Sequence, residues 1–404
     1  MLRRALSAVG GGRPLARRRP IDANDPIAGL RGRQPIRFID WNKAIFADNT
    51  AHPMIDCVLD SFLVSKQRTE EFVVKRLIFI PLLILWAQAA VAASPTIVDG
   101  DYVAAAIARN AIVWDVRPAA AYAKGHIAGA ISIGDAAKVL RDENTEDFIA
   151  TDRIEKILGA AGLDPHRETI VYGSRGTWNP YFGLYTLQYF GGSNVRVYHD
   201  GIEDWAAAGR VISLDSAQLP PVALKLEVDP AVAVSTKEMT ARLNDPNVQI
   251  VDVRTPQEFV GEDIRAIRGG HIPGAINIPY EQNWIDPETP AKLARKQTTN
   301  NGGMSLKAAE DLKRLYSRLD RGKETIVYCQ SGARASETAG VLQHLGFTNV
   351  KVYDSSWLGY GNSLDAPADN VTFFNVGLLN SRLLALQDRV NQLEKELAEA
   401  RAQK

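Results

Sequence analysis

The chain has 404 residues, of which 46% are hydrophobic, so it is long enough for two globular domains with substantial cores. Lysine plus arginine and aspartate plus glutamate number 47 each, and this neutral balance argues against nucleic acid as a partner, because phosphate binding requires a basic surface. The six histidines are scattered and the two cysteines, Cys57 and Cys329, lie far apart. We therefore expect neither a metal site nor a cofactor.

A basic start, an apolar middle and a small-residue cleavage site follow one another in residues 73–92. The apolar run extends from Leu77 to Trp86, and Ala90-Val91-Ala92 has the A-x-A form of a cleavage site. This order predicts a signal peptide, a mature chain that begins at Ala93, and a periplasmic or secreted protein. A retained membrane anchor is the alternative, although the run is at the short limit for a membrane span.

Residues 1–72 precede this signal and show no sustained hydrophobic period. We interpret them as an untranslated or disordered leader, with translation starting near Val73. Met1 to Pro20 is rich in arginine and free of acidic residues, which is also typical of a mitochondrial presequence. Removal of the leader and the signal removes Cys57, so Cys329 is then a single thiol in an oxidising compartment and is expected to be reactive.

The body of the chain contains an internal repeat. The first copy carries DVR at 115–117 and GHIAGA at 125–130, and the second carries DVR at 252–254 and GHIPGA at 270–275. In both copies ETIVY and then a segment of the form NV-VY follow in the same order. We predict one domain over 95–215 and a second over 231–367, joined by a proline-containing linker.

Short apolar runs rich in β-branched residues predict buried strands in each copy, and helical segments lie between them. This alternation predicts an α/β fold with a central parallel sheet covered on both faces, which makes each domain three-layered. The predicted strands are Ile112–Trp114, Thr169–Tyr172, Val195–Tyr198, Gln249–Val253, Thr325–Tyr328 and Val350–Tyr353.

The last segment of the chain, 374–402, has a different hydrophobic period. Apolar residues alternate steps of three and four from Val376 to Ala400, which predicts a coiled-coil helix. Arg389 and Glu394 have the spacing of an interhelical ion pair. We expect a homo-oligomer formed through this helix, and a helix packed on its own domain is the alternative.

The predicted strand Thr325–Tyr328 ends at Cys329, followed by Gln330, Ser331, Gly332, Ala333 and Arg334 and a helix predicted over Ser336–Leu345. Ligands of parallel sheets bind at the carboxyl ends of the strands. A short loop before a helix directs backbone N–H groups inward, the helix start adds about half a positive charge, and Arg334 adds a full charge. These features favour the thiolate form of Cys329 and an anion bound beside it.

The DVR and GHIPGA motifs and the CQSGAR loop, in this order within a repeated frame, resemble the two-domain rhodanese sulfurtransferases over 95–367. The resemblance implies that Cys329 is the nucleophile and that its thiolate takes the outer sulfur of a small anionic donor such as thiosulfate. Sulfite leaves, a persulfide forms, and a thiol or cyanide acceptor then takes the sulfur. The first copy has Gly173 where the second has Cys329, which resembles the inactive domain of such proteins.

The remaining motif residues receive two predicted roles. The backbone and side chains of the loop, together with two arginines outside it, are expected to bind the donor. Asp252 and His271 are expected to be structural, because most polar motif residues serve the backbone. The predicted donor-binding residues are Gln330, Ser331, Gly332, Ala333, Arg334, Arg254 and Arg268.

Two departures from the family pattern bear on the donor. Family members specific for thiosulfate carry basic residues directly after the cysteine, where this chain has Gln330 and Ser331, and an arginine where it has Glu258. Mercaptopyruvate-type members have a C-G-S-G-V-type loop, which shares Ser331 and Gly332 but lacks Arg334. We expect thiosulfate as the donor because Arg334 supplies charge, with 3-mercaptopyruvate as the alternative.

Two other classes of function are compatible with parts of the pattern. Dual-specificity phosphatases resemble this fold and have five residues between cysteine and arginine, whereas four separate Cys329 from Arg334, giving a smaller loop. The second alternative is a binding module that carries a persulfide to a protein partner without turnover.

Overall fold

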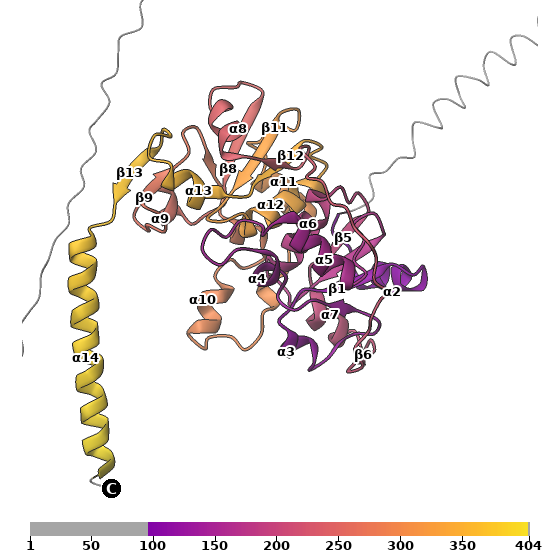
Figure 1. The fold of residues 1–404 in the computed structure, drawn as a ribbon, viewed down its shortest axis with the longest axis horizontal. Coiled ribbons are helices and arrows are strands. Elements are labelled where there is room, and N and C mark those ends of the chain that lie inside the picture. Colours follow the sequence, from indigo (N-terminus) through magenta and orange to yellow (C-terminus); the bar gives the residue numbers. More distant parts are fainter. Residues whose placement is uncertain (1–95, 403–404) are drawn as a thin grey trace, which may run out of the picture. The chain divides into compact units, whose positions relative to one another are not determined.

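The computed structural model describes residues 96–402, and the predicted leader, signal peptide and Cys57 lie outside these residues. No helix in the described part of the chain is long and apolar enough to cross a membrane. Two parallel sheets, one from each copy of the repeat, organise residues 96–373, and a long helix follows them (Figure 1).

The first copy forms a four-stranded sheet in the order β3-β1-β4-β5, in which every pair is parallel. Two further short strands, β2 and β6, pair antiparallel beside it. The strands are β1 (Ile112–Asp115), β2 (His126–Ile127), β3 (Ile131–Ser132), β4 (Thr169–Tyr172), β5 (Val195–Tyr198) and β6 (Ile212–Ser213). The helices are α2 (Gly100–Ala108), α3 (Ala119–Tyr122), α4 (Ala136–Leu140), α5 (Thr151–Ala160), α6 (Asn179–Tyr189) and α7 (Gly201–Ala207).

The second copy forms a five-stranded parallel sheet in the order β10-β8-β11-β12-β7. Strand β9 lies outside it and pairs antiparallel with β13. The strands are β7 (Ala233–Val234), β8 (Val248–Asp252), β9 (Arg268–His271), β10 (Ile276–Asn277), β11 (Glu324–Tyr328), β12 (Val350–Tyr353) and β13 (Asp369–Phe373). The helices are α8 (Thr236–Ala241), α9 (Pro256–Phe259), η1 (Tyr280–Asn283), α10 (Thr289–Ala294), η2 (Gly302–Met304), α11 (Ala309–Leu315), α12 (Ala333–His344) and α13 (Ser356–Asn362).

Both sheets are buried on both faces, because successive strand residues belong to different cores. Trp114 lies in one hydrophobic cluster and its neighbour Val113 in another. In β11, Val327 packs in the first cluster and Ile326 in a third. The predicted three-layer α/β class is therefore confirmed, and each of the six predicted strands is present within one residue of its predicted bounds.

The two copies pack through equivalent helices, α6 and α12, each of which follows the loop at the end of a central strand. A Cβ atom at Gly340 would lie 2.7 Å from Cδ1 of Tyr181, so a glycine is needed where the helices approach most closely. Gln188 and Gln343 exchange side-chain hydrogen bonds of 3.2 and 3.3 Å. One hydrophobic cluster includes residues of both copies, and Cys329 belongs to it. The loop that begins at Cys329 therefore faces the other copy.

The proline-containing linker runs from β6 to β7 without regular secondary structure. Its backbone is held by the first copy: Val222 N donates to the Gly159 carbonyl at 2.9 Å and Leu226 N to the Glu155 carboxylate at 2.8 Å. The linker thus packs along α5 instead of separating the two copies.

The chain ends in helix α14 (Val376–Ala402), which begins two residues after predicted position 374. Every residue of this helix is exposed. The predicted helix is present, whereas its pairing in a coiled coil stays a prediction.

Candidate active site

Cys329 directly follows strand β11 and begins the loop that leads into α12. Its side chain is buried, and its backbone N–H donates to Ser356 Oγ at 3.0 Å. The N–H of Gly332 donates to the same hydroxyl at 2.9 Å, and this hydroxyl donates to the Tyr353 carbonyl at 2.7 Å. Ser356 therefore holds the first and fourth residues of the loop through one oxygen atom.

The remaining N–H groups of the loop are free to bind an anion. Within the described residues, the backbone N–H groups of Gln330, Ser331, Ala333 and Arg334 have no hydrogen-bond acceptor. Helix α12 begins at Ala333, three residues before its predicted start, so these donors and the positive end of the helix dipole coincide. Gly332 makes this turn possible with a φ of +80°.

Arg334 does not face the cysteine as a free charge. It donates to both oxygens of Glu258, each at 2.8 Å, and the two side chains are only 13% and 2% exposed. Burial by itself raises the pKa of Glu258, but the hydrogen bonds and charge of Arg334 outweigh it and lower the pKa to about 2. The pair carries no net charge at neutral pH. The charge that Arg334 was expected to add beside Cys329 is therefore compensated by Glu258.

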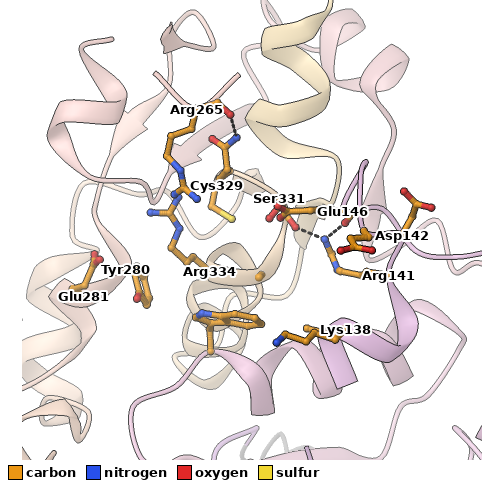
Figure 2. A pocket seen from close by; sticks show the side chains of 15 residues that line it. Lys138, Arg141, Asp142, Glu146, Arg265, Tyr280, Glu281, Cys329, Ser331 and Arg334 are labelled. Atoms are coloured by element: carbon orange, nitrogen blue, oxygen red, sulfur yellow. Dashed lines mark hydrogen bonds between the residues drawn. The ribbon is translucent and has the colours of Figure 1, made fainter. Parts of the chain in front are cut away.

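Cys329 lines a cavity of about 780 Å³ to which both copies contribute (Figure 2). Figure 2 shows Cys329 with Arg265 and Arg334 on one side and Arg141 on the other. The second copy contributes Arg265, Tyr280, Glu281, Cys329, Gln330, Ser331, Ala333 and Arg334. The first copy contributes Ala137, Lys138, Arg141, Asp142, Glu143, Glu146 and Trp178.

Arg141 of the first copy holds the loop of the second. Its guanidinium donates to the carbonyl oxygens of Ser331 and Glu146 and to the carboxylate of Asp354. Burial raises the pKa of Asp354 to about 6, against the lowering effect of the Arg141 charge. The loop is therefore fixed from two directions, by Ser356 beneath it and by Arg141 across the interface.

Residues 99–208 and 235–363 match the family model described as "Rhodanese-like domain". The chain belongs to the rhodanese-like family. It is 34% identical to the Thiosulfate sulfurtransferase of Corynebacterium glutamicum, over 61% of this chain and 81% of that protein. It is 31% identical to the Sulfur carrier protein TtuD of Thermus thermophilus, over 61% of this chain and 86% of that protein. This rhodanese-like protein is therefore a sulfurtransferase.

Among solved structures, the fold is similar to that of the anaerobic ergothioneine biosynthesis enzyme from Chlorobium limicola. The TM-score is 0.56 at 21% identity, and the match covers 68% of this chain and 69% of that one. This likeness concerns the fold alone.

In this sulfurtransferase Arg254 does not line the cavity; it is buried in a network around Asp252. Its guanidinium donates to both oxygens of Asp252 and to the Gly270 carbonyl, and the Tyr328 hydroxyl donates to Asp252 at 2.7 Å. The first copy repeats this network with Arg117, Asp115, Gly125 and Tyr172. Because the copy without a cysteine keeps the network, the donor-binding role predicted for Arg254 is replaced by a structural one.

Arg268 is also buried and does not line the cavity. It donates to the carbonyls of Ser363 and Ala366, at 2.9 and 2.7 Å, at the end of α13. This position does not agree with the predicted role in donor binding, since Arg268 lies away from the cavity and its Nη2 is bonded to the backbone. Arg265, three residues earlier, lines the cavity with its side chain half exposed. His271 stacks on Phe259 with ring centroids 3.6 Å apart, and lies away from the cavity.

The corresponding loop of the first copy, from Gly173 to Trp178, is covered by the second copy. A Cβ atom at Gly176 would lie 2.2 Å from the Cβ of Met304. His199 contacts the Met304 carbonyl at 2.9 Å, and Ser305 donates to Asp200 at 2.5 Å. Residues 301–305 therefore fill the position at which a ligand of the first copy would bind.

Sequence reasoning missed Arg141 and Trp178, two cavity residues that lie outside the motifs of the second copy. Trp178 occupies the loop position that Arg334 has in the second copy. Aligning the two loops predicts this equivalence, but that the tryptophan lines the cavity of the other copy depends on how α6 and α12 pack.

Proposed function

We propose that this sulfurtransferase moves a sulfane sulfur from thiosulfate to a thiol or cyanide acceptor through a persulfide on Cys329. The observation that carries the proposal is the position of this thiol: it lines a cavity at the start of α12, beside four backbone N–H groups without acceptors in the described residues. A thiolate and an anionic leaving group are both stabilised by such donors.

In the first step the Cys329 thiolate attacks the outer sulfur of the donor. A new S–S bond forms to Cys329, the S–S bond within thiosulfate breaks, and sulfite leaves with the electron pair of that bond. The loop N–H groups hold the negative charge, which passes from the thiolate to the departing sulfite. The product on the enzyme is a persulfide.

In the second step an acceptor thiolate or cyanide attacks the outer sulfur of the persulfide. The Cys329–sulfur bond breaks and its electron pair returns to Cys329 as a thiolate, so the loop donors stabilise the leaving group. The cavity of about 780 Å³ is larger than cyanide requires, which favours an organic thiol as the natural acceptor.

The choice of donor depends on the charges that remain once ion pairs are formed. Glu258 compensates Arg334 and Asp354 compensates Arg141. Arg265 and Lys138 are the further cations that line the cavity. Arg265 shares Glu258 with Arg334, at 3.4 Å, so one carboxylate faces two arginines and a positive charge remains for a dianion. Similarity to proteins named thiosulfate sulfurtransferase supports the same donor, and 3-mercaptopyruvate is the competing one.

The test is single-turnover mass spectrometry of the purified protein with each donor. Thiosulfate is expected to add about 32 Da, one sulfur atom on the thiolate, and to release one equivalent of sulfite. Cys329→Ser is the control and should gain no mass. If the adduct forms with 3-mercaptopyruvate and not with thiosulfate, the donor is 3-mercaptopyruvate.

Steady-state turnover then separates an enzyme from a carrier. With cyanide as acceptor we expect ping-pong kinetics in both substrates. Formation of the persulfide without turnover of cyanide or small thiols would indicate the carrier function, which the similarity to a sulfur carrier protein favours as the second candidate. Hydrolysis of a phosphate ester in place of sulfur transfer would contradict both.

We also propose that the protein acts outside the cytoplasm after cleavage before Ala93. The proposal rests on the order of basic, apolar and small residues in 73–92. Amino-terminal sequencing of the native protein tests it. A first residue well upstream of Leu77 would contradict export and favour a retained anchor or a mitochondrial presequence.

A further inference from the structure

Helix α14 is a long helix with no partner in the described part of the chain. All 27 residues are exposed, and the helix is capped at its start by Asn375, whose side chain accepts from Leu378 N at 2.9 Å. It follows strand β13 after two residues. An isolated helix gains little stability in water, so a helix of this length with exposed leucines requires an apolar partner.

Most of the exposed apolar side chains of α14 form one seam, and Leu378 and Leu384 lie outside it. Residues at the first position of each heptad alternate valine and leucine, and residues at the fourth position are leucine in three successive heptads. The first-position residues are Val376, Leu383, Val390 and Leu397, and the fourth-position residues are Leu379, Leu386, Leu393 and Ala400. Valine at the first position with leucine at the fourth favours two strands over three or four.

The charges beside the seam select the partner and its direction. In a parallel pair, a residue at the seventh heptad position faces the fifth-position residue five places later in the other helix. Arg389 then faces Glu394, and Glu396 faces Arg401, so two of the flanking contacts are attractive and none is repulsive. Arg389 and Glu396 lie along one edge of the helix, 3.8 Å apart.

An antiparallel pair with the same leucine seam is less favourable. It brings Arg389 opposite Arg389 of the second chain, although Arg382 then faces Glu396 at both ends, and it leaves Glu394 opposite a neutral residue. The parallel direction therefore gives only attractive charged contacts beside the seam, whereas the antiparallel direction gives fewer attractive contacts and one repulsive contact. We propose that α14 pairs with the α14 of a second copy of this chain in a parallel, in-register, two-stranded coiled coil.

This arrangement brings the Cys329-containing domains of the two chains to the same end of the coil. Strand β13 is paired with β9, the strand that carries Arg268 and His271, and only Phe374 and Asn375 separate β13 from the helix. A parallel coil starts at the same residue in both chains. Two cavities built around Cys329 are thus held in one dimer, at the amino-terminal end of the coil.

Sedimentation of the full chain with two matched variants tests the seam. Leu386 and Leu384 are both leucines of α14 and are 63% and 68% exposed, but only Leu386 belongs to the seam. We expect the unmodified chain to sediment at twice the mass of a single chain. Leu386→Asp should raise the dimer dissociation constant by at least about a hundredfold, whereas Leu384→Asp should change it less than about threefold.

Three results would overturn the proposal: a monomer, a trimer or larger assembly, or equal effects of the two aspartates. Tryptophan fluorescence of each variant verifies that the catalytic body is folded, because Trp114, Trp284 and Trp357 are buried there and absent from α14. A dimer that survives Leu386→Asp would place the interface elsewhere on the molecule.

A charge exchange tests the direction of the pair. Arg389→Glu and Glu394→Arg each create like-charge contacts in a parallel pair and should weaken the dimer about fivefold. The double variant restores opposite charges and should recover the original affinity. In an antiparallel pair Arg389→Glu merely replaces one like-charge contact with another, so lack of rescue by the double variant would refute the parallel direction.

Discussion

The loops that start at Gly173 and Cys329 have the same length and follow equivalent central strands, β4 and β11, yet their surroundings differ. Each begins with a carbonyl that accepts from the backbone of the helix at the end of the next strand, Ile202 N at 3.1 Å in one copy and Trp357 N at 3.0 Å in the other. One loop opens on a cavity and the other is covered by Met304. The two loops thus share their backbone hydrogen bond, although only one of them has a cysteine and opens on a cavity.

Three of the differences between the two copies bear on the chemistry of the loop. The first copy has glycine in place of Cys329 and, as the equivalent of Ser356, Gly201, which has no hydroxyl to hold the loop. It has Trp178 at the position of Arg334. By contrast the Asp–Arg–Tyr networks are the same in both copies. The network residues are thus present in the copy without a cysteine, whereas the residues expected to stabilise a thiolate are absent from it.

Exchanging the nucleophile between the copies is expected to have the largest effect. Cys329→Ser should lower sulfur transfer from thiosulfate by at least about a thousandfold, because the persulfide has no other acceptor atom. Adding Gly173→Cys to this variant should not restore turnover, since Met304 covers that loop. Cyanide-dependent thiocyanate formation measures both. Restored activity would mean that the first loop is accessible to a donor.

Removing Arg141 tests whether the first copy holds the Cys329 loop of the second copy in place. Arg141→Ala removes the contacts with the Ser331 carbonyl and Asp354, and a loop displaced by about 1 Å should lower kcat roughly tenfold to a hundredfold. Lys138→Ala is the matched control, because Lys138 lines the same cavity without contacting the loop. We expect the control to raise the thiosulfate KM with little effect on kcat. Equal effects of the two variants on kcat would contradict a positioning role.

Neutralising Glu258 should convert Arg334 into a free donor-binding charge. Glu258→Gln is expected to lower the thiosulfate KM about tenfold, because an uncompensated guanidinium then faces the anion. Glu281→Gln provides a comparison, since Glu281 is a cavity carboxyl without an ion pair in the described residues. An unchanged KM in Glu258→Gln would show that Arg334 does not reach the donor.

The same variant should also differ from the unmodified protein in how its free energy of unfolding depends on pH. The pKa of Glu258 is about 2 in the folded protein and 4.5 ordinarily. Its contribution to the free energy of unfolding is therefore complete above pH 4.5 and is lost as the pH falls from 4.5 toward 2, by about 3 kcal/mol in total. Urea unfolding between pH 5.5 and about 3 measures this decline. The free energy of unfolding should fall more in the unmodified protein than in Glu258→Gln.

Making the second loop resemble the first at Ser356 should have the smallest effect. Ser356→Gly removes the hydroxyl that accepts from Cys329 N and Gly332 N, but it also relieves a left-handed φ of +49° that disfavours serine. With these effects opposed, we expect kcat to fall about fivefold at nearly unchanged stability. Alkylation of Cys329 by iodoacetamide should slow in parallel, and an unchanged rate would indicate that the helix start alone holds the thiolate.

Local patterns were enough to predict the strands and the place of the nucleophile. Each of the six predicted strands is a short, mainly apolar run, and Cys329 directly follows one of them, so its position at the carboxyl end of the sheet could be predicted without knowledge of tertiary contacts. The two-residue strands β3, β7 and β10 of the same sheets were not predicted. The start of α12 was placed three residues late, since Ala333 and Arg334 carry no capping signal of their own. Arg254 and Arg268 were assigned to the donor because a motif gives the residue type and not the direction of its side chain.

The sequence by itself determined a duplicated α/β unit and a cysteine set at a strand-to-helix loop, because hydrophobic period and loop length act between near neighbours. Only the tertiary structure decided which charges remain free at that cysteine. Arg141 contacts Ser331 across 190 residues of sequence, and Glu258 neutralises Arg334 across 76. Such pairs depend on how α6 packs on α12 and how α9 lies beside the loop, and electrostatic interactions follow distance in space and not separation along the chain.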